Sequence, residues 1–218
     1  MKLKAGWEQL TCRLDGWNKA MKWVSAFILS AIDLQMLMQW EIDKISPSAD
    51  LKSTSDGQVL SWVQQTMWIG ALSGGILGLI HPQLFIIGHV AMLEMLHQPN
   101  NIANMEDTKA VMSAWALPFT GISLVMNCLS PIHRDVHDSH PWMDLLILHG
   151  PYCGCCIELW SLGIWLRYKS STGVAICGKV LPHAVSDCEG EQACLAYYMW
   201  DSVHNKLHLP AGQWMNVN

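Results

Sequence analysis

The sequence predicts an α+β fold in which a helical N-terminal region packs on a β-rich core. Apolar residues near the start recur every three or four positions, as on one face of a helix: Trp7, Leu10, Leu14 and Trp17. Beyond residue 114, short apolar runs alternate with turn-forming residues, which is typical of strands. The 218 residues show no internal repeat and no long linker. We therefore expect a helical region at 1–114, a β-rich core at 115–208 and a tail at 209–218.

Several breaks divide the helical region. Residues 1–40 keep helical apolar spacing, whereas residues 45–58 are mostly polar and predict a loop. A helix restarts at residue 58, and the sequence His-Gln-Pro-Asn-Asn at 97–101 ends a later one. Residues 108–115 form one more candidate helix.

The β-rich core begins with an alternating run. Ile122, Leu124 and Met126 fall on one face of an extended segment, and Ser-Pro follows at 130–131. Further short apolar runs lie at 143–148, 157–159, 164–168, 174–177 and 194–199. Gly, Pro and Ser/Thr clusters separate these runs. Many short strands at this spacing predict a sandwich or a barrel.

Two histidines and one aspartate form a candidate metal site. On an extended strand, His133 and Asp135 share a face while Arg134 points away. His183 follows 50 residues after His133, which is enough chain for several short strands. Two imidazoles and one carboxylate are the ligand set of non-haem Fe(II) oxygenases, and they leave coordination positions open. The pattern therefore indicates an iron oxygenase.

A wider set of motifs surrounds these residues. They read Pro-Phe at 118–119, Ser-Pro-Ile-His-Arg-Asp at 130–135, Leu-Gly-Ile at 162–164, Arg-Tyr at 167–168, Gly178, His-Ala-Val at 183–185, Cys-Glu-Gly at 188–190 and Cys-Leu-Ala-Tyr-Tyr-Met at 194–199. In this order, from Trp115 to about Leu207, the chain resembles the TET/JBP-like Fe(II)/2-oxoglutarate-dependent dioxygenase domain of basidiomycete fungi. Ile-His-Pro-Gln-Leu at 80–84 is similar to the helical lead-in of that family.

The resemblance implies a double-stranded β-helix, a jelly-roll barrel with iron in its mouth. His133, Asp135 and His183 match the iron ligands, which makes them the expected metal and catalytic residues. The implied reaction is oxidation of methylated bases in DNA, 5-methylcytosine above all, with 2-oxoglutarate as co-substrate. The base has to leave the duplex, because a stacked methyl group is out of reach.

The resemblance also suggests residues that contact the substrate. Animal members of the wider group follow the HxD motif with a His-Asn pair that faces the target base, and His137 and Asp138 are the nearest positions here. Asn127, another matched position, is assigned to substrate binding with them.

The sequence departs from the family where the co-substrate binds. The fungal family usually has Arg at the position of Gln192, and expected basic residues are also replaced at Cys128 and Trp200. Arginine forms charge-assisted hydrogen bonds with the carboxylate of 2-oxoglutarate, whereas glutamine donates only neutral ones. The replacement costs on the order of 2 to 5 kcal/mol of co-substrate binding. Two interpretations stay open. Either Lys179 or Arg167 reaches the carboxylate together with Gln192, or the barrel binds iron, turns over poorly and acts as a binding module.

The charge of the chain bears on its partner. The net charge is −5 with a pI near 6.0, and no basic stripe is evident. DNA binding draws much of its affinity from phosphate neutralisation, so we expect weak or partner-assisted DNA binding, or a substrate other than DNA.

Membrane insertion and secretion are disfavoured. Asp33 interrupts the apolar stretch at 23–40, and His81-Pro82 interrupts the one at 68–92, so neither offers about 20 continuous apolar residues. No signal-peptide layout is seen at the start. The eight cysteines include a Cys-Gly-Cys-Cys group at 153–156 near His149, but no second pair completes a zinc site. We expect free thiols in a reducing compartment, nuclear or cytoplasmic.

Overall fold

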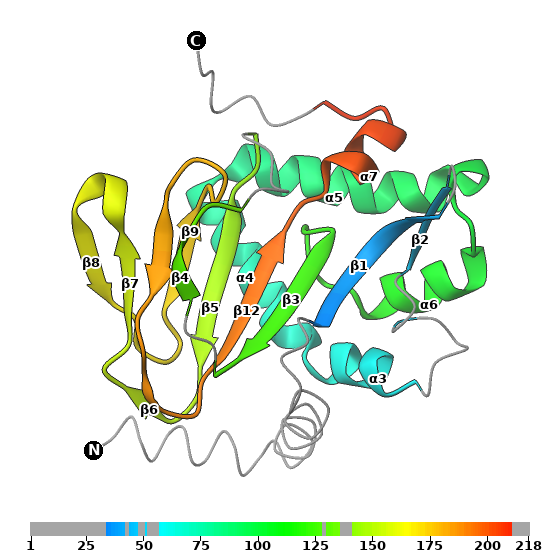
Figure 1. Ribbon diagram of the computed structural model, residues 1–218. Helices are drawn as coiled ribbons and strands as arrows, with labels where there is room; N and C mark the ends of the chain where they lie inside the picture. The colour runs from blue at the N-terminus through cyan, green and yellow to red at the C-terminus, as the bar shows by residue number, and fades with distance from the viewer. Residues whose placement is uncertain are drawn as a thin grey trace.

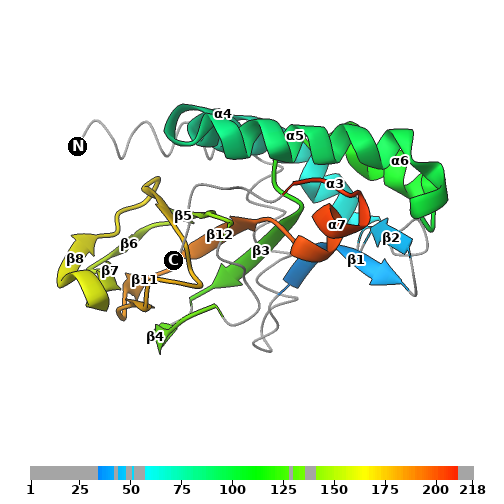
Figure 2. The same cartoon turned by 90° about the horizontal axis from the view of Figure 1, so that it is seen from above.

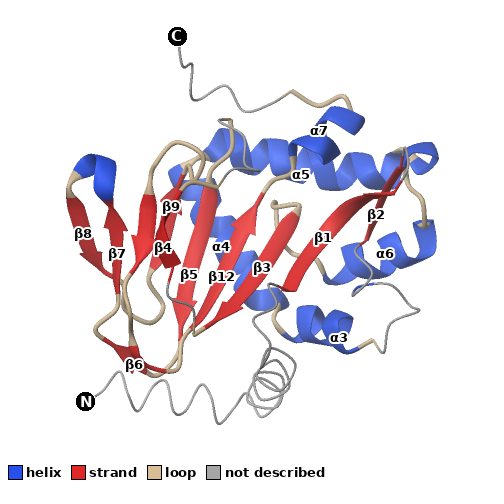
Figure 3. Ribbon diagram, in the orientation of Figure 1, coloured by secondary structure: helices blue, strands red, loops and turns tan. Residues whose placement is uncertain are grey.

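A computed structural model describes residues 34–41, 44–47, 51, 57–127, 130–135 and 141–210. Its described residues form a helical layer and two antiparallel sheets (Figures 1 and 3). Seen from above, the six-stranded sheet lies between the long helices on one side and strand β4 on the other (Figure 2). The mixed architecture agrees with the α+β class predicted from the sequence.

Among the described residues, four α-helices lie between β2 and β3 in the chain. They are α3 (Gln58–Gln65), α4 (Met67–Ile80), α5 (Pro82–His97) and α6 (Met105–Ala114), with a 3-10 turn at Pro99–Asn101. Pro82 occupies the first turn of α5, where its missing N–H is no loss, and the His81 ring accepts a hydrogen bond from the Leu84 N–H. The Asn104 side chain caps α6 in the same way through the Asp107 N–H. The breaks predicted at residues 81–82 and 97–101 are confirmed.

The larger sheet has the strand order β2-β1-β3-β12-β5-β9. Its strands are β1 (Leu34–Glu41), β2 (Lys44–Pro47), β3 (Gly121–Met126), β5 (Asp144–His149), β9 (Gly173–Ile176) and β12 (Ala193–Tyr198). β12 is central, pairing with β3 on one side and β5 on the other. A short helix, α7 (Asp201–Lys206), follows it.

The smaller sheet has the order β4-β10-β7-β8. Its strands are β4 (Ser130–His133), β7 (Cys156–Leu159), β8 (Ile164–Arg167) and β10 (His183–Val185). The 3-10 turn Trp160–Leu162 joins β7 to β8, and a two-stranded ribbon pairs β6 (Tyr152–Cys153) with β11 (Glu189–Gly190). From β3 onward, the chain passes from the larger sheet to the smaller one and back three times.

Two cores hold these layers together. The first joins the helices to the larger sheet, and Leu77 and Leu84 of the helices are buried with Leu195 and Tyr197 of β12. The second lies between the sheets, where Leu148 and Ile176 of the larger sheet meet Ile157 and Leu159 of the smaller one. Each such side chain contributes about 1.5–3 kcal/mol when it is fully buried.

Strand β12 shows how one segment serves both cores. Ala193, Leu195 and Tyr197 point toward the helices, while Cys194, on the opposite face, packs against the core between the sheets. Period-two alternation of side chains produces this division. The burial thus confirms that residues 194–199 form a strand, as the sequence predicted, with β12 starting one residue earlier and ending at Tyr198.

The structure corrects the N-terminal expectations. Residues 34–41 form strand β1, where helical spacing predicted a helix, and β1 joins the sheet by pairing with β3. Residues 44–47 form β2, so the loop predicted at 45–58 starts later, and Ile45 is buried in the core. The helical stripe predicted before residue 34 and the final residues of the tail lie outside the described residues.

The structure also corrects the expectation that the cysteines are free thiols. Cys155 and Cys188 form a disulfide, with Cα atoms 4.7 Å apart, so the free-thiol expectation is wrong for these two. The bridge ties the residue before β7 to the loop after β10.

Separately, no helix within the described part of the chain is long and apolar enough to cross a membrane.

Candidate metal centre

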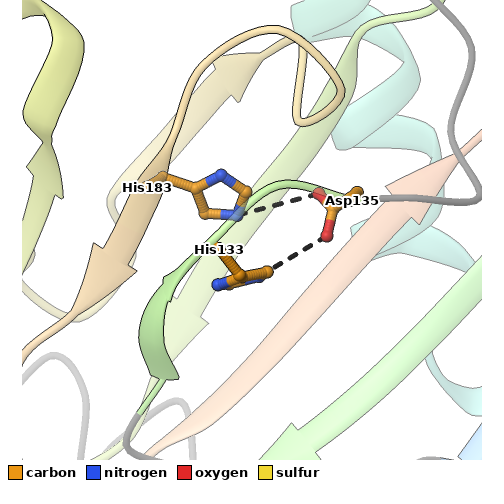
Figure 4. Close-up of side chains that lie close together, drawn as sticks. All are labelled: His133, Asp135 and His183. Carbon is orange, nitrogen blue, oxygen red and sulfur yellow. Dashed lines mark ion pairs between the residues drawn. The ribbon is translucent and has the colours of Figure 1, made fainter.

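The two histidines of the predicted ligand set lie on neighbouring strands. His133 is the last residue of β4 and His183 is the first residue of β10, and the two are directly paired in the antiparallel register. Their ring centroids are 4.3 Å apart. Asp135 follows β4 by two residues and turns back toward both rings (Figure 4). Residues 50 positions apart in the chain are thereby brought together.

The distances suit a divalent metal ion. Nε2 of His133 lies 3.5 Å from one carboxylate oxygen of Asp135, and Nε2 of His183 lies 3.7 Å from the other. One ligand atom from each of the three residues falls within 4.8 Å of the others. An ion held at about 2.1 Å by three mutually adjacent ligands needs ligand atoms separated by about 3 Å, so small side-chain rotations suffice. Among the described residues, this is the one group of three or more His, Cys, Asp or Glu arranged to hold a metal.

The hydrogen bonds of the two rings select the required tautomer. Nδ1 of His133 donates to the Pro131 carbonyl at 2.7 Å, and Nδ1 of His183 donates to the Leu181 carbonyl at 2.9 Å. In each case the acceptor is the carbonyl two residues earlier. A proton fixed on Nδ1 leaves the Nε2 lone pair free to bind a metal. Both rings are therefore oriented so that Nε2 can bind a metal ion.

The site is open on one side. His183 is 4% exposed, whereas the side chains of His133 and Asp135 are 38% and 37% exposed. The buried histidine anchors the centre in the space between the sheets, and the other two ligands face solvent. An ion bound here retains accessible positions for further ligands, which is the arrangement of a reactive rather than a structural metal site.

The local backbone differs from the predicted one. The sequence rationale placed His133 and Asp135 on one extended strand, but β4 ends at His133. Asp135 is held instead by its N–H, which donates to the Gly178 carbonyl at 3.1 Å. The predicted convergence of the two side chains is present, although a turn after β9, and not strand periodicity, fixes the aspartate.

The residues predicted for the co-substrate lie in different places. Gln192 is 6% exposed and precedes β12, and its side-chain oxygen lies 3.8 Å from the sulfur of Cys155. Arg167 is exposed on β8, the edge strand of the smaller sheet, and β7 separates it from β10. Lys179 is half-buried in the turn before β10.

Asn127 lies beside Gln192. Its N–H donates to the Gln192 carbonyl at 3.0 Å, and its side-chain oxygen accepts from the Gln192 N–H at 2.7 Å. These bonds join the end of β3 to the start of β12, and Asn127 adopts a positive φ of 47° there. The other residues predicted to contact substrate, His137 and Asp138, lie outside the described residues.

Sequence reasoning missed one residue next to the ligands. Asp144 is 6% exposed at the start of β5, and its carboxylate accepts a hydrogen bond from the Gly178 N–H at 3.3 Å. A single Asp at the start of an apolar run carries no local signal of such a contact. Only the pairing of β5 with β9 shows that it meets the turn next to Asp135.

Comparison with known proteins identifies the family. The Tet_JBP model, described as the oxygenase domain of the 2OGFeDO superfamily, matches residues 51–201. Among solved structures, NgTET1 in complex with 5mC DNA has a similar fold, with a TM-score of 0.55 and 11% identity over 85% of this chain and 69% of that chain. A search of curated proteins found no match. Because the family model spans well over half of the sequence, the chain belongs to the Tet/JBP family of oxygenases that use Fe(II) and 2-oxoglutarate.

Proposed function

We propose that this oxygenase oxidises a methylated nucleobase of the 5-methylcytosine type in DNA. The observation that carries the proposal is the assembled set of His133, Asp135 and His183 on an oxygenase scaffold, open to solvent on one side. The similar structure of NgTET1 was obtained with 5mC DNA, which supports a modified base as substrate. Bound Fe(II) supplies the redox chemistry by which O2 converts a methyl group and 2-oxoglutarate into a hydroxymethyl group, succinate and CO2.

The strand order supports a double-stranded β-helix. The larger sheet contributes β3, β12, β5 and β9 in that spatial order, and the smaller contributes β4, β10, β7 and β8. In chain order the strands alternate between the two sets, except that β7 and β8 follow each other in the smaller sheet, as in an eight-stranded jelly roll built from two antiparallel sheets. In this scheme the second and seventh strands, β4 and β10, carry the histidines at one end of the barrel.

The co-substrate pocket is proposed to lie between the metal ligands and Gln192. His183 and Val185 lie on the same face of β10, and Val185 packs against the inter-sheet core, which includes Cys155. Gln192 lies next to Cys155. His133, Asp135 and His183 would hold the ion, and the distal carboxylate of a bound keto acid would then face the Gln192 amide. The amide donates a neutral hydrogen bond to the distal carboxylate, and Lys179 or Arg167 stays the proposed source of positive charge.

The base is proposed to approach from the open side of the centre. His137 and Asp138 follow Asp135 closely in the chain, which supports their assignment to the target base, and Asn127 stays a proposed substrate residue. Because the net charge is −5, the affinity for phosphate is low, and binding of DNA is proposed to be weak or assisted by a partner. A base already unpaired is the favoured substrate, since extrusion costs a few kcal/mol.

A second candidate function rests on one observation. The buried Gln192 stands where the family usually carries a charged anchor, and weaker co-substrate binding favours a module that binds DNA with little turnover. The two functions predict the same fold and the same metal centre. They differ in whether 2-oxoglutarate is consumed.

One assay separates them. The full chain is incubated with Fe(II), 2-oxoglutarate and O2 with a single-stranded or duplex oligonucleotide that contains 5-methylcytosine, and succinate and oxidised nucleosides are measured by mass spectrometry. We expect both products, with the single strand preferred, and neither from His133→Ala or from an unmethylated oligonucleotide. Succinate without an oxidised base would point to another substrate. Succinate at the level of His133→Ala would overturn the enzymatic proposal in favour of the binding module.

A further inference from the structure

The turn between β9 and β10 touches two of the three metal ligands. The N–H groups of Val180 and Leu181 both donate to the Cys177 carbonyl at 3.0 Å, which closes the turn. Within it, the Gly178 carbonyl accepts the Asp135 N–H, and the Leu181 carbonyl accepts Nδ1 of His183. The position of this turn therefore sets where the carboxylate lies and how the His183 ring is rotated.

Gly178 lies very close to the Asp135 side chain. A Cβ atom placed on Gly178 would lie 1.9 Å from a carboxylate oxygen of Asp135 and 3.0 Å from one of Asp144. Only glycine permits this approach, because any side chain would push the Asp135 carboxylate away from the two imidazoles. The glycine backbone thus lies between two carboxylates, one that is a metal ligand and one that is not.

Asp144 holds the turn from the other side. It lies opposite Ile176, the last residue of β9, so its carboxylate reaches the backbone two residues further on. There it accepts the Gly178 N–H at 3.3 Å while 6% exposed. A hydrogen bond from a backbone N–H to a buried carboxylate is stronger than a neutral one and fixes the plane of that peptide.

We propose that Asp144 is a positioning residue of the metal centre, which acts through Gly178 to place Asp135 and His183. The inference rests on the proposed assignment of His133, Asp135 and His183 as the metal ligands. The Asp144 carboxylate fixes the peptide between Cys177 and Gly178, whose carbonyl closes the turn by accepting the Val180 and Leu181 N–H groups. The closed turn places the next carbonyl, that of Gly178, at the Asp135 N–H, and it presents the Leu181 carbonyl to His183. Asp144 is not among the three residues whose ligand atoms converge, and its loss lowers metal affinity because two ligands are no longer pre-oriented.

The test compares variants of Asp144 by their binding of Co(II) alone. Asp144→Leu keeps the branched shape at Cγ, although it is larger, and has no acceptor, whereas the isosteric Asp144→Asn keeps an oxygen that can accept the Gly178 N–H. Titration calorimetry under anaerobic conditions measures the affinity of the tag-free full chain, and the visible absorption of bound Co(II) reports the ligand geometry. Thermal unfolding of each metal-free protein measures stability separately.

We expect Asp144→Leu to bind Co(II) at least about tenfold more weakly, with an altered absorption spectrum, and Asp144→Asn to bind within about threefold of the wild type. A folded Asp144→Leu protein with wild-type affinity and spectrum would overturn the proposal. Equal losses in both variants would also overturn it, because they would show that the acceptor is not what matters.

Gly178→Ala keeps the test decisive where Asp144→Leu does not fold. We expect it to lose Co(II) affinity by at least about tenfold, while Gly173→Ala, on β9 with open contacts of 3.7 Å or more, keeps it. Wild-type affinity in Gly178→Ala would refute the role of the turn.

His133→Ala checks the underlying site: if it binds Co(II) as the wild type does, the metal assignment itself fails. Loss of metal in His133→Ala without any base oxidation by the wild type would leave the positioning role standing and remove the proposed reaction.

Discussion

His133 and His183 are a directly paired couple in the antiparallel ladder between β4 and β10, and each ring is locked by the carbonyl two residues before it. Identical local hydrogen bonds thus hold two candidate ligands that are far apart in sequence. The pair differs in one respect: His183 is buried and His133 is more than one third exposed. Mutating the two residues should therefore have the same effect on metal binding but different effects on stability.

Replacing either histidine by alanine is expected to remove Co(II) binding, but only His183→Ala should cost stability. The buried ring leaves a void and an unpaired Leu181 carbonyl, for a loss of about 1–3 kcal/mol, whereas His133→Ala should change the free energy of unfolding by less than about 1 kcal/mol. Urea denaturation and metal titration measure the two effects. His89→Ala, an exposed histidine of α5, is the matched control and should change neither. If both His133→Ala and His183→Ala still bind Co(II), the assignment of these histidines as metal ligands is wrong.

Gln192→Arg is expected to strengthen binding of 2-oxoglutarate and to lower the stability of the protein when 2-oxoglutarate is absent. An arginine at this position gains a charge-assisted bond to the distal carboxylate, worth about 2–5 kcal/mol, but leaves an unpaired charge in a site that is 6% exposed when the co-substrate is absent. Binding is measured by calorimetry with Mn(II) in the site, and unfolding by urea with and without 2-oxoglutarate. Gln192→Met, neutral and of similar size, is the control. Unchanged or weaker 2-oxoglutarate binding by the arginine variant would show that the pocket does not extend to this residue.

The sequence was sufficient to single out three residues that the fold brings together and to locate most core strands, because both leave local signals. His133, Asp135 and His183 stood out by type and spacing, and alternation marked runs such as 194–199. Residues 34–40, Leu-Gln-Met-Leu-Met-Gln-Trp, carry apolar positions compatible with both a helix and a strand. A short apolar run of this kind is decided by its partner, here β3, and not by its own pattern.

Contacts between distant segments could not be predicted from the sequence, because local patterns do not reveal which segments are partners. Eight cysteines allow many pairings, so the bond between Cys155 and Cys188 had no signature in the spacing. Asp144 likewise gains its significance only when β5 and β9 are aligned. The basidiomycete subgroup of the family rests on the sequence motifs alone and stays a prediction.

Gly88→Ala is expected to be severely destabilising, although alanine is the better helix former. A Cβ at Gly88 of α5 would lie 2.1 Å from the Pro118 carbonyl oxygen, so the helix has to move away from the segment that leads into β3. The strain should cost more than about 2 kcal/mol, compared with a gain of up to about 1 kcal/mol from helix propensity. Gly75→Ala on α4, with no atom within 4 Å of the added carbon, should be neutral or stabilising. Urea midpoints of the two variants check the difference, and equal midpoints would show that α5 does not pack closely on Pro118.

Stability is expected to fall as the pH drops below about 6.5, the ordinary pKa of histidine, because the folded state favours the neutral form of the half-buried His149 and of the buried His204. Burial lowers the pKa of His149, and burial also lowers the pKa of His204, against smaller opposing effects of the Trp200 carbonyl and the Asp201 carboxylate. In the unfolded chain both rings take up protons near pH 6.5, whereas the folded protein resists protonation until lower pH. Their stabilising contribution is therefore complete above that pH and is lost as the pH falls through the folded-state pKa values. The ring of His204 packs against Trp142, so His204→Phe keeps an aromatic ring there and removes one titrating group. Urea midpoints at pH 5.5 and 7.5 should differ less in this variant than in the wild type, and an unchanged difference would exclude His204 as a source of the pH dependence.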